Sequence, residues 1–456
     1  MSETLAQAIA RAGSPVELLR NQSWPAFTFP VAPEFTNWRD EQRAWNTTVA
    51  LMDQSHHMTQ LFMHGADVIP LLQTISPNTF ATFRKGVAKQ LISVNKDGFL
   101  IGDGILFYNE EGEDGLVLIG HHILIDWVRY NLEKAEADGK DVHHRLEANS
   151  NMREGAPPTF YRYELQGPLA NEVLAKVLTA PAPTVKFFHI GDFEIAGTHV
   201  YGLRHGMAGQ PGFEFYGPWA DSDLILETLM EAGAEFGIRR VGAKAYSSSP
   251  LESGWVPTPF PAIFEDDFAE YREWLPAARA GSVAGSLYST DIADYYMTPF
   301  DIGLGRSVKF DHDFHGREAL ERIAESPKRR KVTLIWNSED VADIIRSQVE
   351  PGTPAKFLDF PKARYGFYQM DEVQAGGKTV GVSTDAGYVS FDQLYMSLAA
   401  LDVDLEDGAE VEVLWGEDPI SQKPQVDAAH RQVRIRATVA PAPFHDFART
   451  VYRANA

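Results

Sequence analysis

The chain has 456 residues, of which 63 are acidic and 41 basic, giving a formal net charge of −22 at pH 7. Domains commonly hold about 100–150 residues, so this length predicts two to four of them. The absence of cysteine excludes disulfides, thiolate nucleophiles, cysteine-ligated zinc and ordinary iron–sulfur clusters. An acidic chain repels phosphate backbones and anionic lipid, so we expect neither nucleic acid nor a membrane as a partner.

The amino-terminal segment contains acidic residues and lacks the apolar stretch of a signal peptide. No segment approaches the roughly 20 consecutive apolar residues that a membrane-spanning helix requires. We therefore expect a cytoplasmic protein.

Predicted strands and helices alternate through the first half of the chain. Apolar, β-branched and aromatic runs bounded by Gly and Asp indicate strands, and apolar spacing of i, i+3, i+4 indicates helices. The first series is a strand at 59–65, a helix at 66–75, strands at 89–95, 99–109 and 116–120, and a helix at 123–138. A similar series follows, with a strand at 160–167, a helix at 168–178, two strands within 186–205, a strand at 212–218 and a helix at 222–237.

The recurring order predicts two copies of one α+β unit, separated by a polar linker at 147–160. Coincidence is the alternative, because strand–helix patterns are common in α+β chains. From residue 331 onward strands dominate, at 331–336, 379–389, 409–416 and 431–440, which predicts a separate all-β domain. We therefore expect domains at 1–150, 151–330 and 331–456, with a pocket at the seam between the related units.

Two carboxylates stand inside predicted apolar strands. Asp103 lies between two glycines, and Glu214 lies between two phenylalanines. A buried carboxylate needs a partner or a ligand because its desolvation is costly, although Asp103 is equally compatible with a hydrogen-bonded structural role. Tyr246 and Trp255 bracket a polar segment that suits a loop, and their rings suit stacking on a flat ligand.

Several histidines occur as adjacent pairs. Neighbouring side chains on a strand point to opposite faces, so at most one member of a pair should face a given pocket. For the pairs at 56–57 and 121–122, beside predicted strands, pocket-facing and structural roles are equally supported, whereas the pair at 143–144 favours a structural role. The acidic and histidine cluster at 311–315 precedes a predicted helix, which favours helix capping over metal binding. We expect no metal site.

Several segments in order resemble the glycine-cleavage T-protein superfamily of tetrahydrofolate-dependent enzymes. They are DGFLIGDGILF, ELQGP, RHGMAGQPGFEFYGP, AYSSSPLESGW and VKFDHDFHGREAL. Within it, APEFTNW, DQSHHM, RHGMAG and LESGW are most similar to bacterial O-demethylases of lignin-derived methoxybenzoates, which transfer a methyl group from an aryl methyl ether to tetrahydrofolate. The resemblance implies two ferredoxin-like α+β domains and a carboxy-terminal jelly-roll-like barrel around a central folate channel.

The resemblance also implies a set of folate-binding residues. Glu214 would hold the pterin, its carboxylate accepting from ring N–H groups. Gln166, Phe188 and Trp255 would line the same pocket. Asp103 matches an acidic position that interacts with folate or substrate in the aminomethyltransferases.

On the substrate side, the resemblance implies that Tyr246 contacts the phenolic oxygen and that Gln54 and His57 face the aromatic ring. The chain departs from the vanillate-type pattern at Phe27, where a tyrosine is expected, and at His121, where an arginine for the substrate carboxylate is expected. His121 or His122 could donate instead, more weakly than a bidentate guanidinium. These departures leave the carboxylate contact open.

Taken together, these features predict demethylation of a methoxylated aromatic acid, with syringate first and vanillate or 3-O-methylgallate next. Tyr246 would donate to the leaving oxygen, and His57 would fix the ring. Because folate and an aromatic acid are both anions, we expect local positive charge at Arg204 and at the histidines 57, 121 and 122. The alternatives are an aminomethyltransferase or folate-dependent N-demethylase, and a folate-binding module without catalysis. The pattern indicates no oligomeric state.

Overall fold

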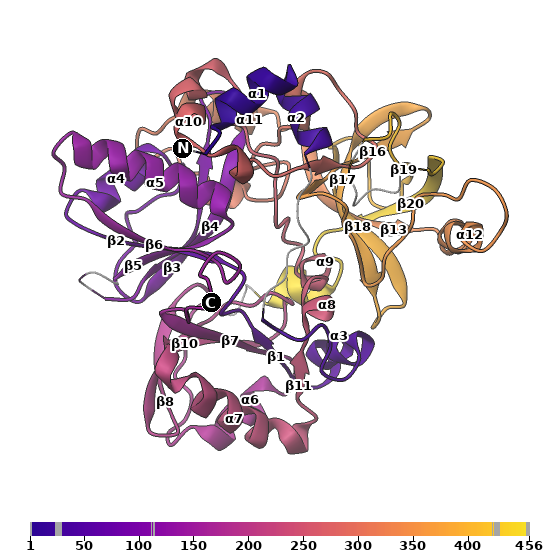
Figure 1. Cartoon of the computed structure of the whole chain (residues 1–456). Coiled ribbons are helices and arrows are strands. Elements are labelled where there is room, and N and C mark those ends of the chain that lie inside the picture. Colours follow the sequence, from indigo (N-terminus) through magenta and orange to yellow (C-terminus); the bar gives the residue numbers. More distant parts are fainter. Residues whose placement is uncertain are drawn as a thin grey trace.

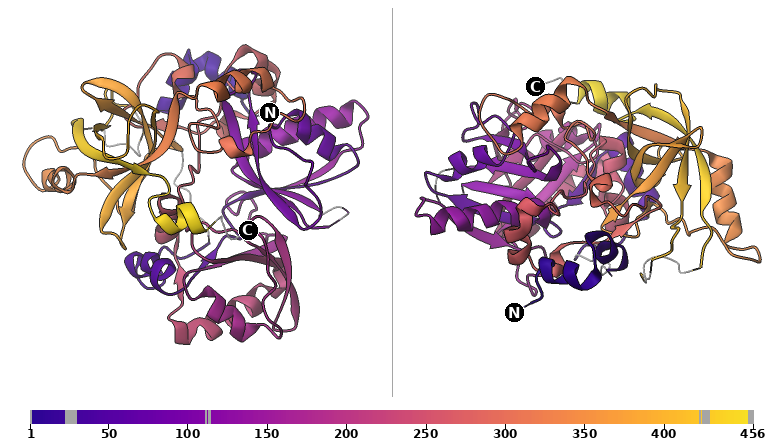
Figure 2. Two further views of the ribbon diagram at one scale, coloured as in Figure 1. Left: turned by 180° about the vertical axis from the view of Figure 1, so that it is seen from behind. Right: turned by 90° about the horizontal axis from the view of Figure 1, so that it is seen from above.

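The computed structural model describes residues 2–22, 30–110, 112, 115–421, 423 and 429–452. Two α+β units and a β barrel surround a common centre (Figure 1, Figure 2). In Figure 1 the first unit is purple, the second is magenta and lies below it, and the barrel is orange to yellow on the right. Residues from all three units can therefore reach one central region.

The first α+β unit is an antiparallel five-stranded sheet with strand order β3-β4-β5-β2-β6. Its elements are β2 (Thr59–His64), α4 (Val68–Thr74), β3 (Val87–Val94), β4 (Leu100–Tyr108), β5 (Leu116–Gly120), α5 (His122–Ala137) and β6 (His143–Glu147). Alternate strand residues such as Leu61 and Leu118 are fully buried and pack with Leu124 and Val128 of α5. This apolar face explains why the helices cover one side of the sheet.

The second α+β unit is a six-stranded sheet with strand order β11-β1-β7-β10-β9-β8. Its elements are β1 (Ala50–Asp53), β7 (Phe160–Gln166), α6 (Ala170–Val177), β8 (Ile190–Ile195), β9 (Thr198–Leu203), β10 (Gly212–Pro218), α7 (Ser222–Gly233) and β11 (Arg239–Val241). The cluster beneath the helices includes Leu165, Val173, Phe215 and Ile225.

The two sheets share one strand order once β1 is set aside. The order β6-β2-β5-β4-β3 corresponds to β11-β7-β10-β9-β8, with β1 inserted between β11 and β7. β1 pairs parallel with β11 and antiparallel with β7. It precedes the first unit in sequence but belongs to the second sheet. Contrary to expectation, the segment 1–150 therefore does not form one structural unit.

The carboxy-terminal unit is a six-stranded barrel. Its strands are β13 (Arg329–Trp336), β16 (Asp371–Ala375), β17 (Lys378–Val389), β18 (Leu394–Asp402), β19 (Glu410–Trp415) and β20 (Val433–Pro441). They run in the order β17-β16-β19-β20-β13-β18, and β18 pairs again with β17, which closes the ring. A jelly roll has eight strands, so the barrel differs from that expectation. Short β14 (Lys362–Ala363) pairs with β17.

The remaining elements connect the three units. They are α1 (Leu5–Ala12), α2 (Pro15–Asn21), α3 (Trp38–Thr47), α8 (Ala243–Tyr246), α9 (Ser249–Ser253), α10 (Ala269–Trp274), β12 (Val283–Ala284), α11 (Arg317–Glu325), α12 (Ser338–Ser347) and β15 (Tyr368–Gln369). A hydrophobic core joins α1 and α2 with the segment 256–314, and Figure 1 shows α3 beside β11. Among the described residues, no helix has the length and hydropathy required of a transmembrane segment.

Contrary to expectation, the cluster at 311–315 does not cap α11. Gly316 is the N-cap residue, with φ of 87°, and no side chain caps the helix. Asp311 instead accepts a 2.6 Å hydrogen bond from the Thr79 hydroxyl, and Asp313 pairs with Arg317 at 3.0 Å. Glycine occupies this position because a Cβ would clash with the Asn95 carbonyl oxygen and because its φ is positive. Within the described part of the chain, no His, Asp and Glu cluster is arranged as a metal site.

Candidate active site

Two adjoining cavities lie where the three units meet. The outer cavity has a volume of about 350 Å³, a size typical of small-molecule sites. The inner cavity is smaller, at about 90 Å³. Met58, Gly120, Met207 and Trp255 line both, so the two spaces are contiguous.

Most of the residues expected at a site line one of these cavities. The outer cavity is lined by His57, His121, His122, Tyr246 and Trp255, and the inner one by Gln54, Asp103, Phe188, Glu214 and Trp255. Phe27 lies outside the described residues. Gln54 was expected beside the aromatic substrate but lines the inner cavity.

Two neighbouring parallel strands deliver Tyr246 and His57 to the outer cavity. β1 and β11 pair in register from Ala50 with Arg239 to Met52 with Val241. The chain then continues from β1 to His57 and from β11 into α8, which ends at Tyr246. The Tyr246 hydroxyl lies 3.0 Å from His57 Nε2, and the rings meet edge to face at 5.0 Å.

Burial keeps this pair uncharged. It raises the pKa of the Tyr246 hydroxyl well above its usual range, and the nearby carboxyls of Glu164 and Glu214 raise it further. Burial also lowers the pKa of His57 to about 4. At neutral pH the contact therefore joins a neutral phenol to a neutral imidazole, and Tyr246 can present a protonated hydroxyl to the cavity.

Glu214 has an ion-pair partner that the sequence did not reveal. Arg162 Nη1 lies 2.8 Å from Glu214 Oε1, and the two side chains are only 2% and 5% exposed. The guanidinium also lies over the rings of Phe107 and Tyr216, 4.7 Å from each centroid. The two ring contacts orient the guanidinium, and the ion pair in turn fixes the Glu214 carboxylate at the wall of the inner cavity.

A second carboxyl, Glu164, lies beside Glu214 and was not predicted. The two residues are cross-strand neighbours in β7 and β10. Glu164 is fully buried and accepts hydrogen bonds from the Gln54 amide and the Met207 backbone N–H. Burial raises its pKa well above the usual range, and the charge of Glu214 adds to this effect. Glu164 thus fixes Gln54 from behind the cavity wall.

Asp103 is bonded to two donors on a single oxygen. Gln90 Nε2 lies 2.8 Å and Trp255 Nε1 lies 3.0 Å from Asp103 Oδ2. Burial raises the pKa of this carboxyl, although both hydrogen bonds oppose the rise. Asp103 therefore fixes the orientation of the Trp255 ring, which lines both cavities.

Phe188 and Gln166 differ in their relation to the inner cavity. Phe188 lines it with a φ of 57°, a left-handed conformation that is costly for a bulky residue. Gln166 was expected to line the same pocket but does not. Its amide oxygen accepts from the Ala208 N–H at 2.9 Å, and its amide nitrogen donates to the Gln210 carbonyl at 3.1 Å. Gln166 supports the loop that forms the wall.

The positive charge near the cavities also differs from expectation. Arg204 donates to the Val185 carbonyl and lines a separate surface pocket. Burial lowers the pKa of His121 well below its usual value and that of His122 to about 4, so neither is a cation at neutral pH. The cations that line the outer cavity are instead Lys362 and Arg364 of the barrel.

The low pKa of His122 predicts a measurable effect on stability. Its ordinary pKa is 6.5 and burial lowers it to about 4, so the folded state resists protonation between these values. Stability from this group is therefore present above pH 6.5 and is lost as the pH falls toward 4. We expect His122→Gln, which does not titrate, to remove about 3 kcal/mol of this acid sensitivity.

Denaturant titrations of both proteins between pH 7 and pH 4 measure the difference. His199→Gln is the matched control, because His199 is exposed on β9 and its ion-pair partner, Asp192, is exposed as well. Parallel stability–pH curves for wild type and His122→Gln would contradict the prediction.

Comparison with known proteins identifies the family. The model of the GCVT N-terminal domain matches residues 2–258, more than half of the chain. The chain is 41% identical to syringate O-demethylase from Sphingobium sp. (strain NBRC 103272 / SYK-6), over 99% of this chain and 98% of that protein. It is 30% identical to sesamin methylene transferase from Sinomonas sp. (strain No.22), over 84% and 82%.

More distant relatives agree. An aminomethyltransferase from Pseudothermotoga lettingae is 23% identical over 83% of this chain and 86% of its own. The crystal structure of glycine cleavage system aminomethyltransferase T from Bartonella henselae matches with a TM-score of 0.60 and 18% identity, covering 96% of both chains. That likeness shows a common α+β fold with a terminal barrel. The chain therefore belongs to the GCVT family of tetrahydrofolate-dependent transferases.

Proposed function

We propose that the protein is an O-demethylase that transfers the methyl group of a methoxylated aromatic acid to N5 of tetrahydrofolate. Syringate is the favoured substrate, followed by vanillate and 3-O-methylgallate. The observation that carries the proposal is the Tyr246–His57 pair, a neutral phenol donor held 3.0 Å from an imidazole at the wall of a small-molecule cavity. The 41% identity to a syringate O-demethylase along the whole chain supports the same substrate class.

The inner cavity has the chemistry that a pterin ring requires. Its wall presents the carboxyl groups of Asp103 and Glu214, which suit the N–H groups of a pterin. The rings of Phe188 and Trp255 supply apolar faces on which a flat heterocycle can stack. We therefore assign these four residues to tetrahydrofolate, with Gln166 acting indirectly through the loop that it supports.

The reaction needs positioning and neutralisation of charge, because an aryloxide is a poor leaving group. Tetrahydrofolate supplies the nucleophilic N5 when bound; transfer replaces the methyl carbon's bond to oxygen by one to nitrogen, and the phenol gains the proton that N5 loses. Tyr246 donates a hydrogen bond to the oxygen that gains negative charge. His57 orients that hydroxyl, and Gln54, held by Glu164, borders the adjoining space.

Turnover with a panel of methoxybenzoates tests the proposal. The purified protein is incubated with tetrahydrofolate and syringate, vanillate or 3-O-methylgallate, and 5-methyltetrahydrofolate and the phenol are measured by mass spectrometry. We expect both products in equal amounts and the fastest turnover with syringate. Failure to form 5-methyltetrahydrofolate from any of the three acids would refute the function.

The same assay separates the alternatives. Aminomethyl transfer or N-demethylation would yield a folate product from an amine donor and none from the aryl ethers. Methylene transfer would yield 5,10-methylenetetrahydrofolate, which differs in mass from the 5-methyl form. Binding of tetrahydrofolate without turnover of any donor would favour a folate-binding module without catalysis.

A further inference from the structure

Arg364 lies at the wall of the outer cavity, and its hydrogen bonds go to uncharged groups. Its Nε donates to the Gly366 carbonyl at 3.1 Å, and its Nη2 donates to Thr258 Oγ1 at 3.2 Å and to the Phe367 carbonyl. All three acceptors are neutral. Within the described part of the chain, Arg364 forms no ion pair, and its Nη1 donates no hydrogen bond. A guanidinium in this setting favours an anionic ligand.

The neighbouring charges compensate this guanidinium only in part. Asp385 also lines the cavity, but it pairs with Lys362, and both side chains are less than 10% exposed. Burial is the main cause that lowers the pKa of Arg364, and Asp385 only partly opposes it. Because the Lys362–Asp385 pair is already neutral, Arg364 supplies the net positive charge of this wall.

His121 contacts the same aromatic ring as Arg364. The ring of Phe367 is 5.5 Å from the His121 ring, edge to face, and 5.3 Å from the Arg364 guanidinium carbon. The positive charge of Arg364 contributes to the low pKa of His121, which therefore remains a neutral imidazole. Together the two side chains offer N–H donors of different strength beside one ring that lines the outer cavity.

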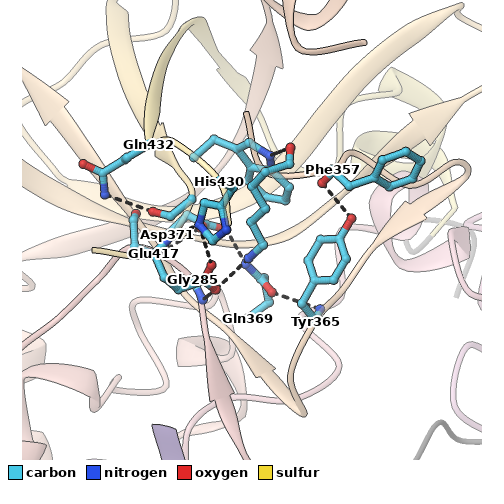
Figure 3. Close-up of polar contacts among 12 residues, drawn as sticks. Gly285, Phe357, Tyr365, Gln369, Asp371, Glu417, His430 and Gln432 are labelled. Atoms are coloured by element: carbon cyan, nitrogen blue, oxygen red, sulfur yellow. Dashed lines mark hydrogen bonds and ion pairs between the residues drawn. The ribbon is translucent and has the colours of Figure 1, made fainter. Parts of the chain in front are cut away.

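A polar cluster, shown in Figure 3, anchors the loop that carries Arg364; it runs from an exposed hydrogen bond of Tyr365 to a fully buried ion pair. Next to Arg364, the Tyr365 hydroxyl donates to the Phe357 carbonyl at 2.7 Å, and its backbone N–H donates to Gln369 Oε1 at 3.2 Å. The Lys356 ammonium lies 4.5 Å from the centroid of the Tyr365 ring.

The cluster continues into the interior of the barrel. Lys356 Nζ lies 2.6 Å from Glu417 Oε1, and neither side chain is exposed. Glu417 Oε1 also accepts from the Gly285 N–H at 2.8 Å, and Gln369 donates to Asp371 at 2.8 Å. These contacts fix the loop both to the barrel and to the segment 256–314, which contains Gly285, so the guanidinium is preorganised.

We propose that Arg364 binds the carboxylate of the aromatic acid, with His121 as a weaker second donor, in place of the arginine expected at position 121. This inference rests on the proposed function, because it requires an acid with its methoxy group at Tyr246 and its carboxylate at Arg364. The Tyr365 hydroxyl acts as a positioning group for the loop. The barrel thus supplies the acid specificity of a site whose reacting groups follow two strands of the second sheet.

Binding of syringate and of its methyl ester tests the proposal, because the ester keeps the ring and loses the charge. We expect Arg364→Gln to raise the Kd and KM of syringate about 30-fold or more and to leave those of the ester nearly unchanged. The Kd of syringate for Arg364→Lys should lie between the values for wild type and Arg364→Gln. Tyr365→Phe should raise the Kd of syringate a few-fold without affecting the ester. Arg346→Gln, a change in an exposed pair on α12, is the control.

If Arg364→Gln weakens the binding of syringate and of the ester equally, or leaves the affinity for syringate unchanged, Arg364 does not bind the carboxylate. If Arg364→Gln does not fold, Arg364→Lys and Tyr365→Phe provide the same comparison. The two proposals fail separately. If the wild-type protein binds syringate but forms no 5-methyltetrahydrofolate, only the demethylase function is refuted. If it demethylates syringate and Arg364→Gln keeps the affinity for syringate, only the role of Arg364 is refuted.

Discussion

Replacing Tyr246 by phenylalanine is expected to lower kcat for demethylation by about 10²–10⁴-fold, the range that a well-placed acid contributes. The phenylalanine ring fills the same space beside His57, but the hydroxyl that lies 3.0 Å from His57 Nε2 is lost. Because the lost interaction acts mainly on the charge that develops during transfer, KM should change little. Single-turnover formation of 5-methyltetrahydrofolate measures the effect.

Two further variants control this experiment. Tyr288→Phe removes a hydroxyl from a tyrosine that is 39% exposed, and it should leave kcat unchanged. His57→Gln keeps the Tyr246 hydroxyl and removes its imidazole partner, so we expect a smaller loss of kcat than in Tyr246→Phe. Near-normal turnover by Tyr246→Phe would exclude the tyrosine from the transfer step.

The largest expected effect on stability comes from Arg162. In Arg162→Met, Glu214 would remain almost fully buried without its 2.8 Å partner. Removing one member of a buried ion pair costs about 3–5 kcal/mol, because the remaining charge is desolvated and uncompensated. We expect a fall of this size in the free energy of unfolding at pH 7, measured by urea titration.

A double variant separates the unpaired charge from lost packing. Arg162→Met combined with Glu214→Gln removes both charges, so it should be more stable than Arg162→Met alone. Arg434→Met is the matched surface control: its 2.9 Å pair with Glu412 is about half exposed, and breaking such a pair costs about 0–1 kcal/mol. If Arg162→Met is no less stable than Arg434→Met, the large stabilising role assigned to the Arg162–Glu214 pair is wrong.

The repeated order of strands and helices along the chain could be predicted because most strands of both units carry apolar runs bounded by turn residues. β1 could not, because all four of its residues are buried and it shows no alternation. Its neighbours β7 and β11 lie more than a hundred residues further along the chain. Whether such a short run joins a sheet depends on those distant partners, which local pattern does not specify.

The site was predictable as a set of residues but not as a network of partners. Glu214 was identified as a charge that needs a donor, yet its partner Arg162 is two residues from Glu164 on β7. Which residue of β7 faces Glu214 depends on the pairing register of β7 and β10. Arg364 escaped notice for a related reason: it follows a two-residue strand, and only the packing of the barrel brings it to the cavity.

The parallel pairing of β1 with β11 has a consequence for how such a site can diversify. Tyr246 and His57 follow adjacent strands of one sheet, so the pairing of those strands sets their separation. Arg364 belongs to a different unit, the barrel. In the proposed scheme the chemistry and the choice of acid are therefore encoded in separate modules. Exchange of residues 362–367 should yield enzymes with new substrate preference and an unaltered phenol–imidazole pair.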